Sequence, residues 1–182
     1  MAWYPLIMFA PLLAMLVWAA IGDLRHRRIP NSLTLAIAAT GLMQTLTSCP
    51  TISPWQSITG LLVGLGLTIA LFALGALGGG DVKLLAAAGT WVGPLLIFQV
   101  FLAAAVLGML IVLIQSLYQG RLRVLLQNTL LLIINLVHIR ELGVEHTQAT
   151  GQSCRSVDKP LPYAVPVLIA LVAMLLLGGH LP

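Results

Sequence analysis

The chain has 182 residues, of which 59% are hydrophobic and 8% are charged, and its formal net charge is +4. A soluble domain carries about 25% charged residues, so this composition excludes an ordinary water-soluble protein and indicates one polytopic membrane domain over residues 1–182. The basic residues flank apolar segments, where membrane topology explains them, and we therefore expect the lipid bilayer and no nucleic acid as a partner.

Apolar segments follow one another along the chain at or near the length that spans a bilayer. They cover roughly residues 6–22, 32–47, 55–77, 82–119 and 163–177. The fourth segment is interrupted by a turn-like cluster of glycine and proline at 89–94, which predicts two helices there. Gly60 and Gly64, one helical turn apart, predict close packing of the third helix. The sequence thus predicts an all-α membrane protein with about six transmembrane helices.

The basic residues support this helix count. A six-helix arrangement places all 9 lysines and arginines on one side of the membrane. They are Arg25, Arg27, Arg28, Lys83, Arg121, Arg123, Arg140, Arg155 and Lys159. Positive charge accumulates on the cytoplasmic side, so both termini are expected to face outward.

The segment 121–140 is ambiguous because its apolar centre is nearly long enough to form a further span. A seventh crossing would move three basic residues to the outer side. We predict instead a helix lying in the cytoplasmic interface, followed by a polar cytoplasmic loop over residues 143–159.

Two carboxylates lie at the ends of apolar helices, Asp23 and Asp81, and the predicted topology puts both at the cytoplasmic boundary. An acidic side chain near hydrocarbon is costly and usually functional. Two neighbouring carboxylates do not readily both ionise, so the pair predicts a catalytic dyad that shares a proton and activates water. We assign the base role to Asp81 because it begins a helix, and the acid role to Asp23.

The residues around Asp81 could accommodate an extended substrate peptide. Gly78, Gly79 and Gly80 lack side chains and permit positive φ, so a peptide could approach closely. Lys83 could anchor the helix in the interface, hold a substrate carboxylate or tune Asp81.

Both aspartates could instead have a structural role. Asp81 could cap a helix by accepting from a backbone N–H near Leu84, and Asp23 could pair with the neighbouring arginines. Asn31 or Ser32 could cap the helix that follows Pro30.

The sequence contains few residues that would support another type of catalytic site. The 4 histidines show no metal-protease spacing, and the 2 cysteines, Cys49 and Cys154, form no CxxC pair. Neither a nucleophilic serine elbow nor a phosphate-binding loop is present in the sequence. We expect no metal and no cofactor.

Asp23 followed by Ile29-Pro30-Asn31, together with Gly78-Gly79-Gly80-Asp81-Val82-Lys83-Leu84, resembles the type IV prepilin peptidases. These are Gly-x-Gly-Asp aspartic peptidases of bacterial inner membranes, and the similarity covers roughly Gly22 to Gly93. The segment Pro162-Tyr163-Ala164-Val165-Pro166 resembles the start of the family's last helix, with Ala164 where glycine is common.

The resemblance implies that Asp23 and Asp81 cut the basic leader from prepilins or pseudopilins at the cytoplasmic face. It further suggests a short, peptidase-only form, because the chain enters the membrane almost at once. The resemblance also makes a pilus or secretion assembly a candidate partner. The alternatives are a non-catalytic membrane subunit of such an apparatus and a small transporter coupled to the two aspartates.

Overall fold

A computed structural model describes residues 8–26, 29–47, 52–73, 77–120, 127 and 163–177. Every regular element defined in these ranges is a helix, in agreement with the predicted all-α class. The helices are α2 (Ala10–His26), α3 (Asn31–Gln44), α4 (Pro54–Ala73), α5 (Gly79–Tyr118) and α8 (Ala164–Leu176). The predicted interfacial helix at 121–140 and the loop at 143–159 lie outside the described residues, apart from the single position 127.

Helix α5 consists of two helices joined at a kink. Gly93 has φ 78 and ψ 176, a conformation that lies outside the helical region and favours glycine. Pro94 follows, and its missing N–H and its ring prevent the preceding turn from continuing. The predicted division of this apolar segment at 89–94 is therefore confirmed. With α5 counted as two, the described residues form six helical segments.

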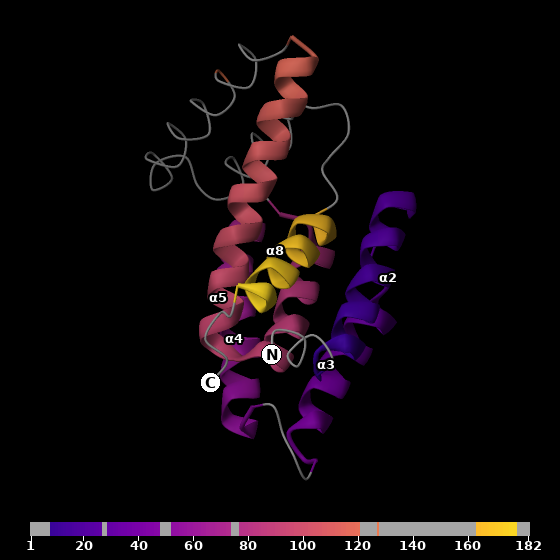
Figure 1. Cartoon of the computed structure of the whole chain (residues 1–182), viewed down its shortest axis with the longest axis vertical. Helices are drawn as coiled ribbons and strands as arrows, with labels where there is room; N and C mark the ends of the chain where they lie inside the picture. Colours follow the sequence, from indigo (N-terminus) through magenta and orange to yellow (C-terminus); the bar gives the residue numbers. More distant parts are fainter. Residues whose placement is uncertain are drawn as a thin grey trace.

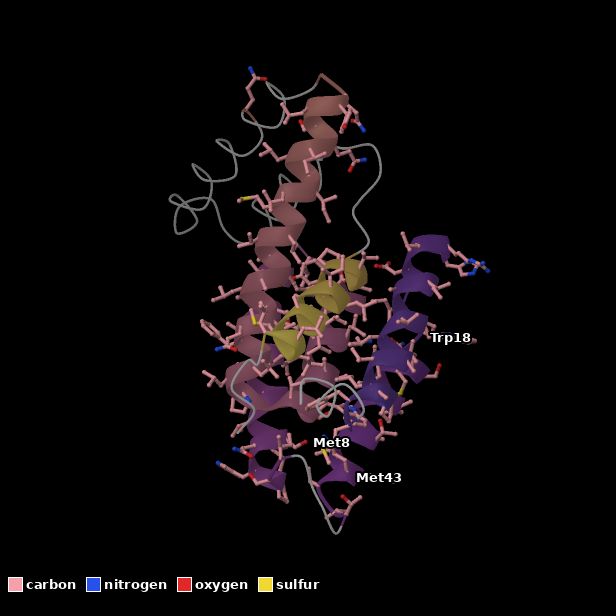
Figure 2. The ribbon with its side chains drawn as sticks, in the orientation of Figure 1. Met8, Trp18 and Met43 are labelled. Carbon is pink, nitrogen blue, oxygen red and sulfur yellow. The ribbon has the colours of Figure 1, made fainter. Side chains whose placement is uncertain are left out.

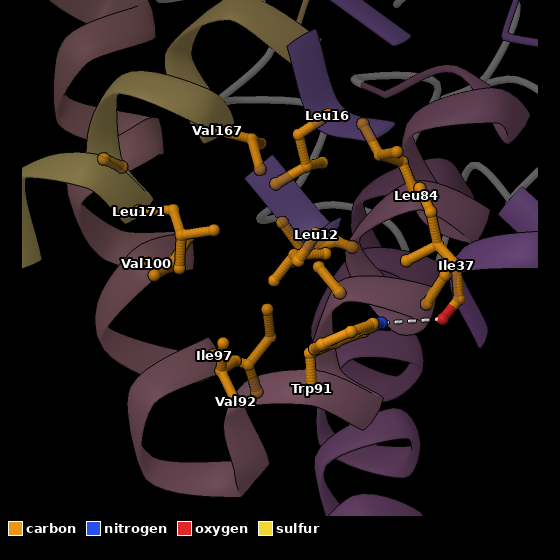
Figure 3. Packing of buried hydrophobic residues seen from close by; sticks show 14 of the residues in the cluster. Leu12, Leu16, Ile37, Leu84, Trp91, Val92, Ile97, Val100, Val167 and Leu171 are labelled. Atoms are coloured by element: carbon orange, nitrogen blue, oxygen red, sulfur yellow. Dashed lines mark hydrogen bonds between the residues drawn. The ribbon is translucent and has the colours of Figure 1, made fainter. Parts of the chain in front are cut away.

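The first half of α5 lies at the centre of the molecule. Helix α5 packs against α3, α4 and α8, and α8 also contacts α2. In Figure 1, α8 lies in front, between α2 and the second half of α5. The buried core between these helices is aliphatic apart from Phe9 and Trp91. The Trp91 indole Nε1 donates to the Ile37 carbonyl at 2.9 Å (Figure 3). This bond fixes α3 against α5 because a buried indole N–H needs an acceptor.

Glycines allow α4 and α5 to approach closely. A Cβ at Gly60 would overlap the Gly89 carbonyl, and one at Gly89 would overlap the Gly60 carbonyl. A Cβ at Gly64 would lie 2.8 Å from the Leu85 carbonyl oxygen. The predicted close packing at Gly60 and Gly64 is confirmed, and the two helices meet backbone to backbone.

The exterior of the helices is apolar. Trp18 on α2, 70% exposed, projects outward in Figure 2, and Met109 on α5 is 65% exposed. Two helices, α4 and α5, are long and apolar enough to cross a membrane, and α8 is shorter and also apolar. Such a surface is stable in lipid, where exposed apolar side chains carry no cost.

Candidate active site

The candidate site forms where the end of α2 meets the starts of α5 and α8. Asp23 lies in the last turn of α2 and is 7% exposed. The backbone N–H of Ala164, the first residue of α8, donates to Asp23 Oδ2 at 3.3 Å. The first N–H groups of a helix have no partner within the helix, so Asp23 satisfies one of them. This bond orients the carboxylate and joins residues that lie 141 positions apart.

Asp81 is the third residue of α5, and its Oδ2 accepts from the backbone N–H of Gly78 at 3.3 Å. Asp81 thus does stabilise the start of its helix, but through Gly78 and not through an N–H near Leu84 as the capping alternative predicted. Among the described residues, no hydrogen bond engages its other oxygen, Oδ1. The side chain is half-buried, so this oxygen remains available to water or to a ligand.

The structure brings the two predicted carboxylates together. Asp23 and Asp81 are close enough that the charge of Asp23 acts directly on Asp81. They come from α2 and α5, whose mutual position is set by α3 and α8. A carboxylate pair of this kind can hold one proton between two groups and act on a water molecule.

The glycines before Asp81 provide space and not unusual backbone angles. Positive φ occurs in the described residues only at Gly93 and Gly120, so the freedom for positive φ that glycine permits at 78–80 is not used. A Cβ at Gly78 would lie 3.1 Å from Asp81 Oδ2, and one at Gly80 would lie 3.4 Å from Ile29 Cβ. Gly79 is exposed, and a Cβ there would lie 3.6 Å from the Phe72 ring. Gly78 therefore makes room for the Asp81 carboxylate, whereas a Cβ at Gly79 or Gly80 would make only ordinary van der Waals contacts.

Lys83 and Asn31 connect the two predicted sequence motifs. Lys83 is exposed, and its Nζ donates to Asn31 Oδ1 at 3.0 Å. Helix α3 begins at Asn31 after Pro30, and no side chain of the described residues caps its start by a hydrogen bond. The expected cap by Asn31 or Ser32 is therefore wrong, because the Asn31 amide oxygen turns toward Lys83.

Sequence reasoning gave no role to Tyr163, the residue before α8. Its hydroxyl is buried and has no hydrogen-bond partner among the described residues. The ring lies close enough to Asp81 for the two groups to interact electrostatically. The one signal in the sequence was the motif at 162–166, which marked the start of the last helix without indicating which atoms face the aspartates.

In the parts of the chain that the structure describes, no three His, Cys, Asp or Glu side chains are grouped so as to hold a metal ion. What the site offers is two carboxylates, a lysine ammonium and a tyrosine hydroxyl, a set suited to moving protons.

Residues 10–113 match the type IV leader peptidase family. Over 107 residues the chain is 36% identical to the type 4 prepilin-like proteins leader peptide-processing enzyme of Escherichia coli O78:H11 (strain H10407 / ETEC). This similarity covers 53% of the chain and 39% of that enzyme, so the chain matches less than half of the relative's length. No solved structure is significantly similar to the chain. The family match covers more than half of the chain and confirms the resemblance that the two aspartate motifs predicted: the chain belongs to the type IV leader peptidase family.

Proposed function

We propose that the protein is an aspartic endopeptidase that removes the basic leader from type IV prepilins or pseudopilins. The proposal places it in the bacterial inner membrane, with the cut made at the cytoplasmic face. Family membership supports the class of reaction, and the similar enzyme from Escherichia coli processes leader peptides by name. The observation that carries the proposal is that Asp23 and Asp81 meet where three helix ends converge.

The proposed topology has six transmembrane helices, with both termini outside. It puts the end of α2 and the start of α5 on the side that carries all 9 lysines and arginines. That side is cytoplasmic by the distribution of positive charge. A prepilin leader is basic and stays in the cytoplasm, whereas the segment after it is apolar and enters the bilayer. A dyad at this boundary therefore meets the junction of the two.

In the proposed reaction Asp81 acts as the base and Asp23 as the acid. Asp81 takes a proton from water while the water oxygen bonds to the carbonyl carbon, and Asp23 gives its proton to the carbonyl oxygen. The C–N bond of the tetrahedral intermediate then breaks. Asp81 passes its proton to the amine nitrogen, and one hydroxyl returns a proton to Asp23 as the new carboxyl group forms. The pair ends in its starting protonation state, and one water is consumed.

The surroundings of the pair fit an extended peptide in the proposed site. Gly78 and Gly79 are exposed and carry no side chain, so a substrate backbone can lie against them next to Asp81. Lys83 lies two residues beyond Asp81, where its Nζ is held by Asn31 at the exposed edge of the site. We assign these residues a supporting role in substrate approach, together with Gly80, which lies beside Ile29.

The test is co-expression of a prepilin with the wild-type chain, Asp23→Asn or Asp81→Asn, followed by mass spectrometry of the pilin N-terminus. Asp158→Asn is the matched control, because it removes the chain's remaining aspartate, which lies in the predicted loop. We expect the control to cleave fully and both dyad variants to leave the leader in place. Full cleavage by either dyad variant would contradict the mechanism. A wild-type chain that binds pilin without shortening it would favour the non-catalytic subunit.

A further inference from the structure

The Tyr163 hydroxyl is a buried polar group that makes no hydrogen bond with the described residues. A buried polar group without a partner lowers stability, and a phenylalanine would fill the same space without that cost. Packing therefore does not explain why this residue carries a hydroxyl. A hydrogen-bond partner that arrives with the substrate would explain it.

The position of the hydroxyl is fixed by its neighbours. The ring packs against the aliphatic core, which limits its rotation. The next residue, Ala164, is bonded to Asp23, while the ring itself is near enough to Asp81 to interact with that charge. The start of α8 thus contributes a backbone N–H to one aspartate and places a tyrosine beside the other.

The missing partner is not Asp81 itself, because no hydrogen bond joins the hydroxyl to that carboxylate in the resting structure. A neutral phenol is a good hydrogen-bond donor, and its pKa in water is about 10. In the proposed reaction the carbonyl oxygen gains negative charge as water attacks the carbon, until the proton from Asp23 is fully transferred to it. A donor next to the dyad stabilises that oxygen if it lies on the opposite side from the attacking water.

We propose that the Tyr163 hydroxyl donates a hydrogen bond to the carbonyl oxygen of the scissile peptide. The proposal rests on the proposed peptidase function and adds a third catalytic group to the two aspartates. The bond forms only when substrate occupies the site and strengthens as the oxygen gains charge, so it acts on the rate of the chemical step more than on substrate binding.

The test is steady-state cleavage of a purified prepilin in detergent micelles by the full-length enzyme, with Tyr163→Phe compared against Tyr118→Phe. Tyr118 is 89% exposed at the end of α5, so it controls for loss of a tyrosine hydroxyl as such. We expect Tyr163→Phe to lower kcat by about 100-fold, as removal of one oxyanion donor does, with KM changed by less than about twofold. Tyr118→Phe should cleave at the wild-type rate.

Two further readouts separate this role from a structural or positioning one. The thermal unfolding temperature of Tyr163→Phe should equal or exceed that of the wild type, because the lost hydroxyl had no partner. The shape of the pH–rate profile should also be unchanged, since the aspartates still perform the proton transfers. A shifted profile or a lower unfolding temperature would show that Tyr163 acts by positioning the aspartates or by holding the fold, and would overturn the proposal.

The rate outcomes distinguish this inference from the proposed function. If Tyr163→Phe cleaves at more than half the wild-type rate while Asp81→Asn is inactive, the tyrosine proposal fails and the peptidase mechanism stands. If Asp81→Asn also cleaves, both fail together.

Discussion

The two ends of the first half of α5 differ in how completely their polar groups are satisfied. They are separated by about 20 Å, the length of a helix of this size. At the kink end, Ser57 Oγ donates to the Thr90 carbonyl at 2.7 Å, and Gln44 Nε2 donates to the Trp91 carbonyl at 3.3 Å. At the other end, Asp81 keeps one oxygen unengaged among the described residues, and Tyr163 has a buried hydroxyl without a partner there.

This difference indicates that the kink end of the helix has a structural role and that the aspartate end is available to bind a substrate. At the kink end, side chains of α3 and α4 donate to the backbone carbonyls of α5, and glycine contacts with α4 hold this end in place. The aspartate end is assembled from α2, α5 and α8 and leaves hydrogen-bonding capacity for a substrate. Rigid elements that present unsatisfied polar groups are what a pre-organised active site requires. Substitutions at the two aspartates, at Gly60, at Ser57 and at Lys83 test this difference, and we expect their effects to decrease in that order.

The aspartates should give the largest effect on cleavage and the least additive one. General acid–base groups contribute about 100- to 10,000-fold each, so Asp23→Asn and Asp81→Asn should each lower kcat by at least 100-fold. Because the two act as one unit, the double variant should be no slower than the slower single variant. Single-turnover cleavage measures all three. Multiplying losses in the double variant would show that the residues act independently.

Gly60→Ala should disrupt the kink end, because the new methyl group overlaps the Gly89 carbonyl on α5. Overpacking of this kind costs about 1–3 kcal/mol in the free energy of unfolding. Gly66→Ala is the matched control in the same helix, since its Cβ would meet nothing within 4 Å. The control should be neutral or stabilised by up to about 1 kcal/mol through helix propensity. Denaturant titration in micelles measures both, and equal stabilities would contradict the close contact.

Ser57→Ala should weaken the same end by a smaller amount. Ser57 is fully buried, and its loss leaves the Thr90 carbonyl without this donor next to the kink. A typical hydrogen bond of this kind contributes about 0.5–1.5 kcal/mol to the free energy of unfolding. Thr59→Ala is the control, because Thr59 bonds only to carbonyls of its own helix. We expect that control to lie within about 0.5 kcal/mol of the wild type. A neutral Ser57→Ala would show that the kink needs no side-chain support.

Lys83→Met should have the smallest effect on cleavage. Its ammonium is exposed and bonds to Asn31, and such a bond contributes about 1 kcal/mol, which corresponds to less than a tenfold change in kcat/KM. Asn31→Ala should produce a similar loss, and the double variant should add little because both changes remove one bond. A loss as large as that of Asp81→Asn would instead mean that Lys83 contacts the substrate directly.

The features that could be predicted from the sequence are those that depend on a local pattern of residues. The break near Gly93 follows from a glycine–proline pair, and the Gly60 packing follows from helical spacing, so both could be predicted. The two aspartates could be singled out because carboxylates are rare next to long apolar segments. The family was recognisable from the residues around them.

The features that sequence reasoning missed depend on contacts between distant segments. The Ala164 N–H reaches Asp23 across 141 positions, and only the packed position of α8 produces that bond. Tyr163 looked like one more apolar residue at a helix start, because its burial and its proximity to Asp81 arise from tertiary packing. Asn31 was assigned to the nearest helix end by local rules, whereas a lysine 52 positions away competes for its side chain.

The proposed mechanism requires Asp23 and Asp81 to lie side by side at one rim of the helix bundle. Disulfide cross-linking in native membranes tests it directly, with Asp23→Cys and Asp81→Cys introduced together after Cys49→Ser and Cys154→Ser. A protease site inserted between α3 and α4 separates the two cysteines in sequence, so a cross-link keeps the fragments together until reduction. The pair Asp23→Cys with Trp55→Cys, in the first turn of α4, is the control. We predict rapid cross-linking of the aspartate pair and none of the control. Failure of the aspartate pair to link faster than the control would rule out the proposed dyad.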